Sequence, residues 1–170
     1  MKHIYYAFRK ALTLFLVSKG QHRELDLQRS LLAAVEDSIG SKQFRQLFRL
    51  DGEDVLNNGM YSCAWYVSNI LAGLRLIGST HGTVESTVKD LKNSGWVEDG
   101  FSHLAPGTVF VWEEVQFPED DRPHKHIGFY TGNNSAVSMN YKDGIPLKHH
   151  ATFEETRKIQ NVFWNPDFDR

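Results

Sequence analysis

The spacing of the hydrophobic residues changes once along this chain, between Gly95 and Pro106, and this change constrains the fold more than any other feature. Before it, apolar side chains recur every three or four residues, as at Leu27, Leu31 and Val35, which predicts amphipathic helices. After it, β-branched and aromatic residues form short runs between turn signals, which predicts antiparallel strands. Helices followed by antiparallel strands indicate the α+β class, and 170 residues suit one domain.

The first 50 residues are predicted to be a helical extension that precedes a core of residues 51–170. Apolar residues at helical spacing predict five helices in the whole chain, over residues 4–15, 27–39, 44–48, 63–78 and 84–91. Gly40 supplies a stop for the second of them. Strands are predicted at residues 108–112, 127–131, 136–140, 145–149 and 159–164, with a hairpin turn at residues 132–135.

The charge of the chain is unevenly distributed. Residues 1–50 carry nine Lys and Arg against four Asp and Glu, although the whole chain has a net charge of −2. The basic segment forms no clustered run, so we expect a solvated helical surface or a docking face for an acidic partner, and no nucleic-acid ligand. The apolar run at residues 11–17 is too short to span a membrane and has no cleavage site, which predicts a cytoplasmic protein as synthesised.

Cys63 is the only cysteine, which excludes an internal disulfide and a multi-cysteine zinc site. It lies in the segment Tyr-Ser-Cys-Ala-Trp-Tyr-Val, residues 61–67, where a loop is predicted to turn into a helix. The free N–H groups and dipole of a helix start stabilise a thiolate, so the position suits a nucleophile. The alternative is a buried structural cysteine.

His126 opens the predicted strand His-Ile-Gly-Phe-Tyr-Thr-Gly, and a histidine there can face a thiol on a helix packed across the strand. Ser138 and Asn140 share one face of the returning strand, and either side chain can orient the imidazole ring. The alternatives are a core or surface histidine and polar residues facing solvent. A metal site made by the histidines was also considered, but their spacing matches no known zinc pattern; they are His124, His126, His149 and His150.

Around these residues the chain resembles the NlpC-like branch of the papain-fold cysteine peptidases, which includes the CHAP amidases. Three blocks match in order over roughly residues 57–150. The first is the cysteine segment. The second, Leu-Ala-Pro-Gly-Thr-Val-Phe-Val-Trp at residues 104–112, is similar to the family's first strand. The third, His-Ile-Gly-Phe-Tyr-Thr-Gly-Asn at residues 126–133, is similar to its histidine block.

The resemblance implies a papain-like fold, in which N-terminal helices and a nucleophile helix pack on an antiparallel sheet. It also implies a Cys63 nucleophile, a His126 base and a third polar residue, for which asparagine in papain-like relatives favours Asn140 over Ser138. The implied reaction is cleavage of an amide bond, most often in peptidoglycan peptides, without a cofactor or metal. The chain departs from the family at Ser62 and Thr108, where Asp is usual, and at the third position, which is often His.

Several further expectations follow from this resemblance. Asn57 or Asn58 is a candidate oxyanion donor, and Tyr61, Trp65 and Trp112 are candidates to line the cleft, with core packing as the alternative for each aromatic ring. Peptidoglycan as substrate implies delivery to the cell wall by lysis or by a secretion machine. The rival interpretations are an intracellular peptidase or deamidase acting on a protein or small amide, and a non-catalytic binding module on the same fold.

Overall fold

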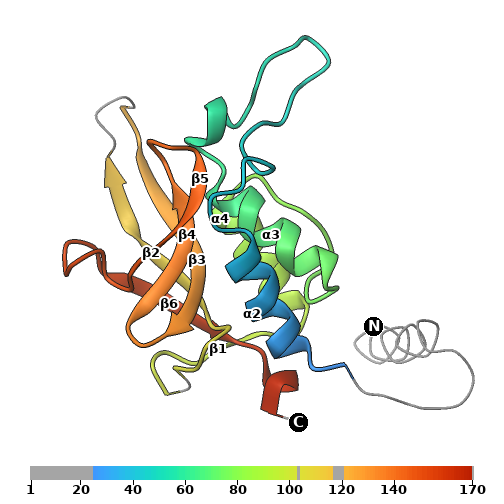
Figure 1. Ribbon diagram of the computed structural model, residues 1–170, viewed down its shortest axis with the longest axis vertical. Coiled ribbons are helices and arrows are strands. Elements are labelled where there is room, and N and C mark those ends of the chain that lie inside the picture. Colours follow the sequence, from blue (N-terminus) through green and yellow to red (C-terminus); the bar gives the residue numbers. More distant parts are fainter. Residues whose placement is uncertain (1–24, 103, 117–120, 170) are drawn as a thin grey trace, which may run out of the picture.

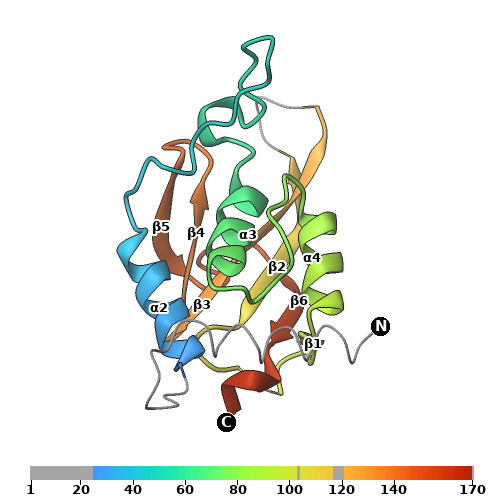
Figure 2. The same cartoon turned by 90° about the vertical axis from the view of Figure 1, so that its right-hand side faces the viewer.

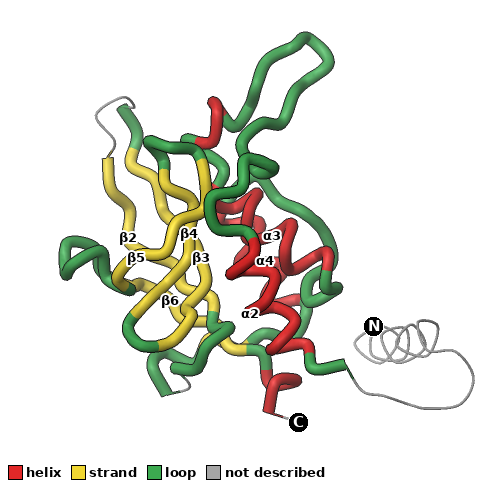
Figure 3. Tube along the Cα trace, in the orientation of Figure 1, coloured by secondary structure: helices red, strands yellow, loops and turns green. Residues whose placement is uncertain are grey.

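Three helices cover one face of a six-stranded antiparallel sheet in the computed structural model, which describes residues 25–102, 104–116 and 121–169 (Figure 1). Figure 3 shows the separation of the helices from the strands. This arrangement confirms the predicted α+β class. The helix predicted at residues 4–15 lies outside the described residues. In the described part of the chain, no helix has the length and apolar character needed to cross a bilayer.

The first and the last of the described helices begin where a side chain satisfies an N–H group of the first turn. Asp26 caps the first described helix by accepting from the backbone of Arg29 at 2.8 Å, and Thr83 caps the last by accepting from Ser86 at 3.2 Å. The helix that starts at Cys63 ends at Gly73, five residues before the predicted end. The helices are α2 (Leu27–Asp37), α3 (Cys63–Gly73) and α4 (Val84–Asn93), with short 3₁₀ turns at Asn57–Gly59 and Pro166–Asp169.

The short helix predicted at residues 44–48 is wrong, because a turn network around Asp54 replaces it. Asp54 accepts hydrogen bonds from the backbone of Leu47, Leu56 and Asn58, at 3.0, 3.1 and 2.7 Å. These bonds fold residues 41–56 into a loop that projects beyond the helices (Figure 1). Only Phe44 of the predicted apolar face is buried. A carboxylate that bonds nearby N–H groups offers the backbone an alternative to the helix.

All five predicted strands are present, and the sheet gains a two-residue strand that the sequence analysis missed. The strands are β1 (Val97–Glu98), β2 (Val109–Gln116), β3 (Pro123–Gly132), β4 (Ser135–Asn140), β5 (Ile145–His150) and β6 (Ile159–Trp164). Their order in the sheet is β1-β6-β2-β3-β4-β5. The predicted hairpin turn joins β3 to β4, where Asn133 and Asn134 adopt φ values of 49° and 58° that asparagine tolerates.

Alternate residues of the strands pack on opposite faces of the sheet. Val109 and Val111 face the helices, whereas Phe110 and Trp112 face a second, smaller apolar cluster. The connection between β5 and β6 covers this second cluster with Phe153. The turn there is left-handed, because residues 153–155 have φ values of 51°, 55° and 64°. Viewed from the side, α2, α3 and α4 lie next to one another in front of the sheet (Figure 2).

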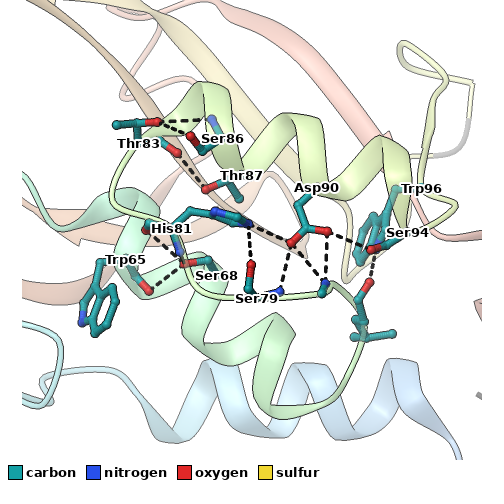
Figure 4. A network of polar contacts seen from close by, with 12 residues as sticks. Trp65, Ser68, Ser79, His81, Thr83, Ser86, Thr87, Asp90, Ser94 and Trp96 are labelled. Atoms are coloured by element: carbon teal, nitrogen blue, oxygen red, sulfur yellow. Dashed lines mark hydrogen bonds and ion pairs between the residues drawn. The ribbon is translucent and has the colours of Figure 1, made fainter.

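A polar network fixes the loop between α3 and α4 (Figure 4). The carboxylate of Asp90 accepts from the backbone of Gly78 and Ser79 at 3.1 and 3.0 Å, and lies 2.7 Å from Nε2 of His81. Ser68 on α3 bonds both the N–H and the carbonyl of His81, at 2.8 and 3.1 Å. The network therefore ties the loop to both helices, just before the chain passes along the cleft described below.

Asp90→Asn should lower the free energy of unfolding by about 2 kcal/mol at neutral pH, because hydrogen bonds to a charged group each contribute more than neutral ones. Burial acts to raise the pKa of Asp90, but its hydrogen bonds from His81, Gly78 and Ser79 outweigh that effect and lower it. The charge therefore stabilises the fold above pH 3.8, and the difference between variant and wild type should vanish as the pH falls further. Urea denaturation at several pH values measures it.

Asp37→Asn is the matched control, because Asp37 lies exposed on α2. An equal loss of stability in both variants would contradict a structural role for the Asp90 network.

Candidate active site

A cleft of about 580 Å³ opens where the start of α3 meets the end of β2 and the start of β3. The predicted nucleophile Cys63 and the predicted base His126 both line it, although they are separated by 63 positions in the sequence. The loop that the Asp90 network fixes forms another part of the wall, through residues 82–85. The cleft therefore joins helix, loop and sheet residues, which the sequence blocks predicted to lie together.

Cys63 is the first residue of α3, and the helix has no side-chain cap, because the hydroxyl of Ser62 donates instead to the carbonyl of Gly59 at 2.8 Å. Burial raises the pKa of the Cys63 thiol. The N–H groups of Ile127 and Ala64 act in the opposite direction. At neutral pH the resting group is therefore a thiol that already lies against N–H donors, which favour its ionised form.

The sulfur of Cys63 lies near the backbone of Ile127 on β3, one residue beyond the end of the pairing between β3 and β4. The pairing of β3 with β4 ends at Gly128 and Ser138, so Ile127 is paired with Val111 on β2 but with no residue of β4 in the described sheet. The Cys63 sulfur is the group that the N–H of Ile127 stabilises. Helix α3 thus places its first side chain one residue from the histidine on β3.

His126 is 7 % exposed, and its ring is held by a hydrogen bond and by aromatic neighbours. Its Nε2 lies 2.8 Å from Oγ of Ser138. The ring of Trp112, opposite it on β2, is 5.4 Å away between centroids. Gly128 makes this packing possible, because a Cβ there would lie 2.7 Å from Cβ of Ser138 and 3.1 Å from Trp112. The strand glycine noted in the sequence is therefore required by the close approach of Ser138.

A second histidine extends the contact. Oγ of Ser138 lies 2.8 Å from Nε2 of His149, and Nδ1 of His149 lies 2.7 Å from the carbonyl of His150. The ring of Phe153 stacks on that of His149 with centroids 4.0 Å apart. Four residues on β3, β4 and β5 therefore form one hydrogen-bonded row.

The directions of these bonds follow from the last acceptor in the row. A carbonyl oxygen only accepts, so Nδ1 of His149 carries the proton and its Nε2 accepts. Ser138 then donates to His149 and accepts from Nε2–H of His126. In neutral His126 the second ring nitrogen, Nδ1, is therefore unprotonated and able to act as a base.

Burial lowers the pKa of His126 well below 6.5, and the charges of Arg157 and His149 lower it further. Burial also lowers the pKa of His149. Both rings are consequently neutral at pH 7, as the row of hydrogen bonds requires. The Cys63 sulfur makes no hydrogen bond to the His126 ring among the described residues, so the resting pair is a thiol and a neutral imidazole that are not in contact.

The two candidates for the residue that orients the His126 ring, Ser138 and Asn140, lie in different places. Ser138 contacts the ring of His126, whereas the side chain of Asn140 accepts from the backbone of Lys142 and Asp143 at 2.9 and 3.1 Å. Asn140 lines the cleft but stabilises the turn before β5. The resemblance to papain-like relatives favoured Asn140, but the side chain that contacts the His126 ring is that of Ser138.

Of the three aromatic residues predicted to line the cleft, only one does so in the described structure. Tyr61 lines the cleft, with its ring 5.2 Å from that of His124. Trp112 is fully buried below the histidine rings, and its Nε1 donates to the carbonyl of Ala151 at 2.7 Å. Trp65 packs against the core beneath the helices and is absent from the described cleft wall. For both tryptophans the core-packing alternative holds.

Neither candidate oxyanion donor lies in the described wall of the cleft. Asn57 and Asn58 adopt φ values of 45° and 56° in the turn before Cys63. The backbone N–H of Asn58 donates to Asp54, and the side chain of Asn57 lies 3.6 Å from the sulfur of Met60. These asparagines build the turn that positions the helix start, which is the simpler alternative.

The amino-acid sequence does not indicate that His149 is a partner of Ser138, and it gives no sign that Arg157 and Phe153 belong to the site. His149 stood out only in the histidine cluster considered for metal binding. In the described residues no group of three or more metal-ligating side chains is placed to hold an ion. Arg157 and Phe153 lie in the connection between β5 and β6. Hydrophobic residues there have no regular spacing that would predict a helix or a strand.

A scan against models of known protein families gives no match to this chain, and a search of curated protein sequences gives none either. The resemblance to NlpC-like peptidases therefore stays a prediction, and the chemistry of the cleft is argued from its geometry.

The stability of the protein should depend on pH through His126. Below pH 6.5 the unfolded chain binds a proton that the folded ring does not, so the free energy of unfolding should fall as the pH drops, by about 1.4 kcal/mol per pH unit from this group. His126→Gln should reduce that slope between pH 6.5 and 5 in urea denaturation. Gln43→Ala, on an exposed loop, is the control, and an unchanged slope in His126→Gln would show that the buried ring is not neutral.

The tautomer of His126 can be read directly by ¹⁵N NMR. We expect the proton on Nε2 at pH 7, because Ser138 accepts there. His149→Phe keeps a ring against Phe153 but removes the acceptor for the Ser138 hydroxyl. That hydroxyl is then free to donate to His126, so the Nδ1–H tautomer should become populated. His149→Gln, which keeps an acceptor, should restore the original signal, whereas an Nδ1–H signal in the wild type would refute the row of bonds.

Proposed function

We propose that this protein is a thiol amidohydrolase of the NlpC-like, papain-fold type, with Cys63 as the nucleophile and His126 as the base. The observation that carries the proposal is the row from His126 through Ser138 to His149, since it leaves a basic nitrogen on a buried histidine in the same cleft as the sole thiol. The α+β architecture, with the cysteine starting a helix on the sheet, supports the papain-like fold.

The reaction begins from neutral groups. Nδ1 of His126 takes the thiol proton while the sulfur of Cys63 attacks the amide carbonyl. This step requires the thiol and ring to approach on substrate binding, since catalytic contacts are often loose in the free enzyme. The backbone N–H at the start of α3 stabilises the oxyanion. The imidazolium keeps its Nε2–H bond to Ser138, so its position is maintained as it charges.

Collapse of the tetrahedral intermediate breaks the carbon–nitrogen bond. His126 returns its proton to the leaving amine, and the acyl group remains on the sulfur of Cys63 as a thioester. The neutral ring then takes a proton from water, which attacks the thioester and releases the acid and the thiol. The low pKa of His126 and the high pKa of Cys63 predict a rate that is constant over a broad range around neutral pH.

Peptide amides of peptidoglycan are the proposed substrate class, as the resemblance implies. A peptidoglycan substrate requires that the protein be delivered to the cell wall by lysis or by a secretion machine. A peptidase or deamidase that acts on an intracellular protein or small amide uses the same chemistry, and the test below separates these substrates by the product released.

Incubation with purified peptidoglycan, and separately with a mixed peptide library, should release new amino groups where a peptide amide is cut and free ammonia where a carboxamide is cut. Mass spectrometry of the products identifies the bond. Cys63→Ala should abolish release, and Ser138→Ala should slow it about 100-fold, within the range of a positioned acid–base group. Ser41→Ala is the matched control in the loop outside the cleft.

A brief acid quench should also reveal the acyl-enzyme as a mass increase on the protein. Turnover that persists in Cys63→Ala would refute the nucleophile. A wild-type protein that cuts none of these amides and forms no acyl adduct would instead favour the non-catalytic binding module.

A further inference from the structure

Arg157 is a buried cation on the wall of the cleft, and the backbone holds it in one orientation. It is 8 % exposed, and its Nε and Nη2 donate to the carbonyl of Glu113 at 3.0 and 2.8 Å. Nη2 also donates to the carbonyl of His124 at 2.9 Å. These carbonyls lie where β2 bulges against β3. Three bonds therefore fix the guanidinium before any ligand arrives, which reduces the entropy lost on binding.

The charge of Arg157 has no carboxylate within 4.0 Å in the described part of the chain, although the carboxylate of Glu113 acts on it from farther away. The acidic side chains that line the cleft are placed differently. Glu85 and Glu114 lie 3.7 and 3.9 Å from Nζ of Lys125 and are largely exposed. Water screens those three charges, whereas the charge of Arg157 is mostly shielded from water.

One end of the guanidinium is available to a ligand. The three hydrogen bonds of Arg157 use Nε and Nη2, so Nη1 bonds no described residue. The guanidinium carbon of Arg157 lies 5.9 Å from the ring centroid of Phe153, which also lines the cleft. The charges of Arg157 and an ionised Cys63 also act on each other. An anion that reaches Nη1 from the cleft therefore shares this cleft with Cys63, which also lines it.

We propose that Nη1 of Arg157 binds a carboxylate of the substrate, so that the cleft selects acidic amides whose carboxylate lies within about one residue of the attacked carbonyl. Selection of a substrate by Arg157 rests on the proposed function, whereas the anion site does not. A planar guanidinium matches a carboxylate, and the two form strong charge-assisted hydrogen bonds. A buried cation without an ion-pair partner gains most from such a ligand.

Alkylation of Cys63 tests the site without a known substrate. Iodoacetate and iodoacetamide both form a sulfur–carbon bond and release iodide, and they differ only in a carboxylate against a neutral amide. Because Cys63 is the sole thiol, intact mass reports the reaction directly. At pH 8.5 and low salt, the ratio of the iodoacetate rate to the iodoacetamide rate should be about tenfold higher for the protein than for N-acetylcysteine.

Arg157→Gln should return this ratio to the N-acetylcysteine value, and Arg157→Lys should keep part of the preference. Lys125→Gln is the matched control, because it removes the same charge from the same cleft but from a screened side chain. A wild-type ratio equal to that of N-acetylcysteine, or an equal loss in Lys125→Gln, would overturn the proposal.

If Arg157→Gln does not fold by circular dichroism, protection of the wild type decides. Propionate should slow the alkylation by iodoacetate and propionamide should not, and an equal effect of both would refute the anion site. Failure of the hydrolase proposal is separate, because alkylation needs no turnover. A protein that prefers iodoacetate but cuts no amide retains the site and loses only the enzyme assignment.

With an active enzyme, paired amides with glutamate or glutamine beside the cut bond add a second measurement. A carboxylate site predicts that Arg157→Gln lowers kcat/KM for the glutamate substrate alone. Equal losses on both substrates would assign Arg157 to the oxyanion and overturn its role in binding a substrate carboxylate.

Discussion

The hydrogen bond between His126 and Ser138 is the contact on which the rest of the cleft depends. It forms because Gly128 lacks a side chain, so that β4 approaches β3 closely enough for a serine hydroxyl to reach the ring. Beyond this point the pairing of β3 with β4 ends, and the N–H of Ile127 acts on the sulfur of Cys63. One missing Cβ thus determines the position of the base, and the end of the strand pairing determines the position of the nucleophile.

Burial shifts the pKa values of the two reacting groups in opposite directions. It disfavours the thiolate of Cys63 and the imidazolium of His126, so both groups rest uncharged. A resting ion pair would need partners for two buried charges, whereas the row of neutral hydrogen bonds satisfies His126 without one. Arg157 is the exception, a buried charge fixed by carbonyl oxygens. The buried charge of the cleft is therefore the guanidinium of Arg157 on its wall, whereas the reacting pair is neutral.

The elements with a clear hydrophobic period were predictable from the sequence, as was the pairing of Cys63 with His126 in one cleft. Residues whose roles depend on long-range contact were not. Asn140 was preferred by analogy, but its side chain prefers the adjacent turn, because an amide one residue from a tight turn finds backbone donors locally. The role of Arg157 could not be predicted, because it bonds backbone carbonyls far away in the sequence. Every residue has a backbone carbonyl, so no residue type marks these partners.

The left-handed turn at residues 153–155 carries Phe153 and Arg157 to the wall of the cleft, and it lies late in the chain. During translation, Cys63 leaves the ribosome long before this turn exists. The helices and the first hairpin can then fold with the thiol in place but without the cation beside it. On the ribosome, the cleft is complete only after β6 has joined β2 in the middle of the sheet, so an unfinished chain contains the nucleophile but lacks the completed wall.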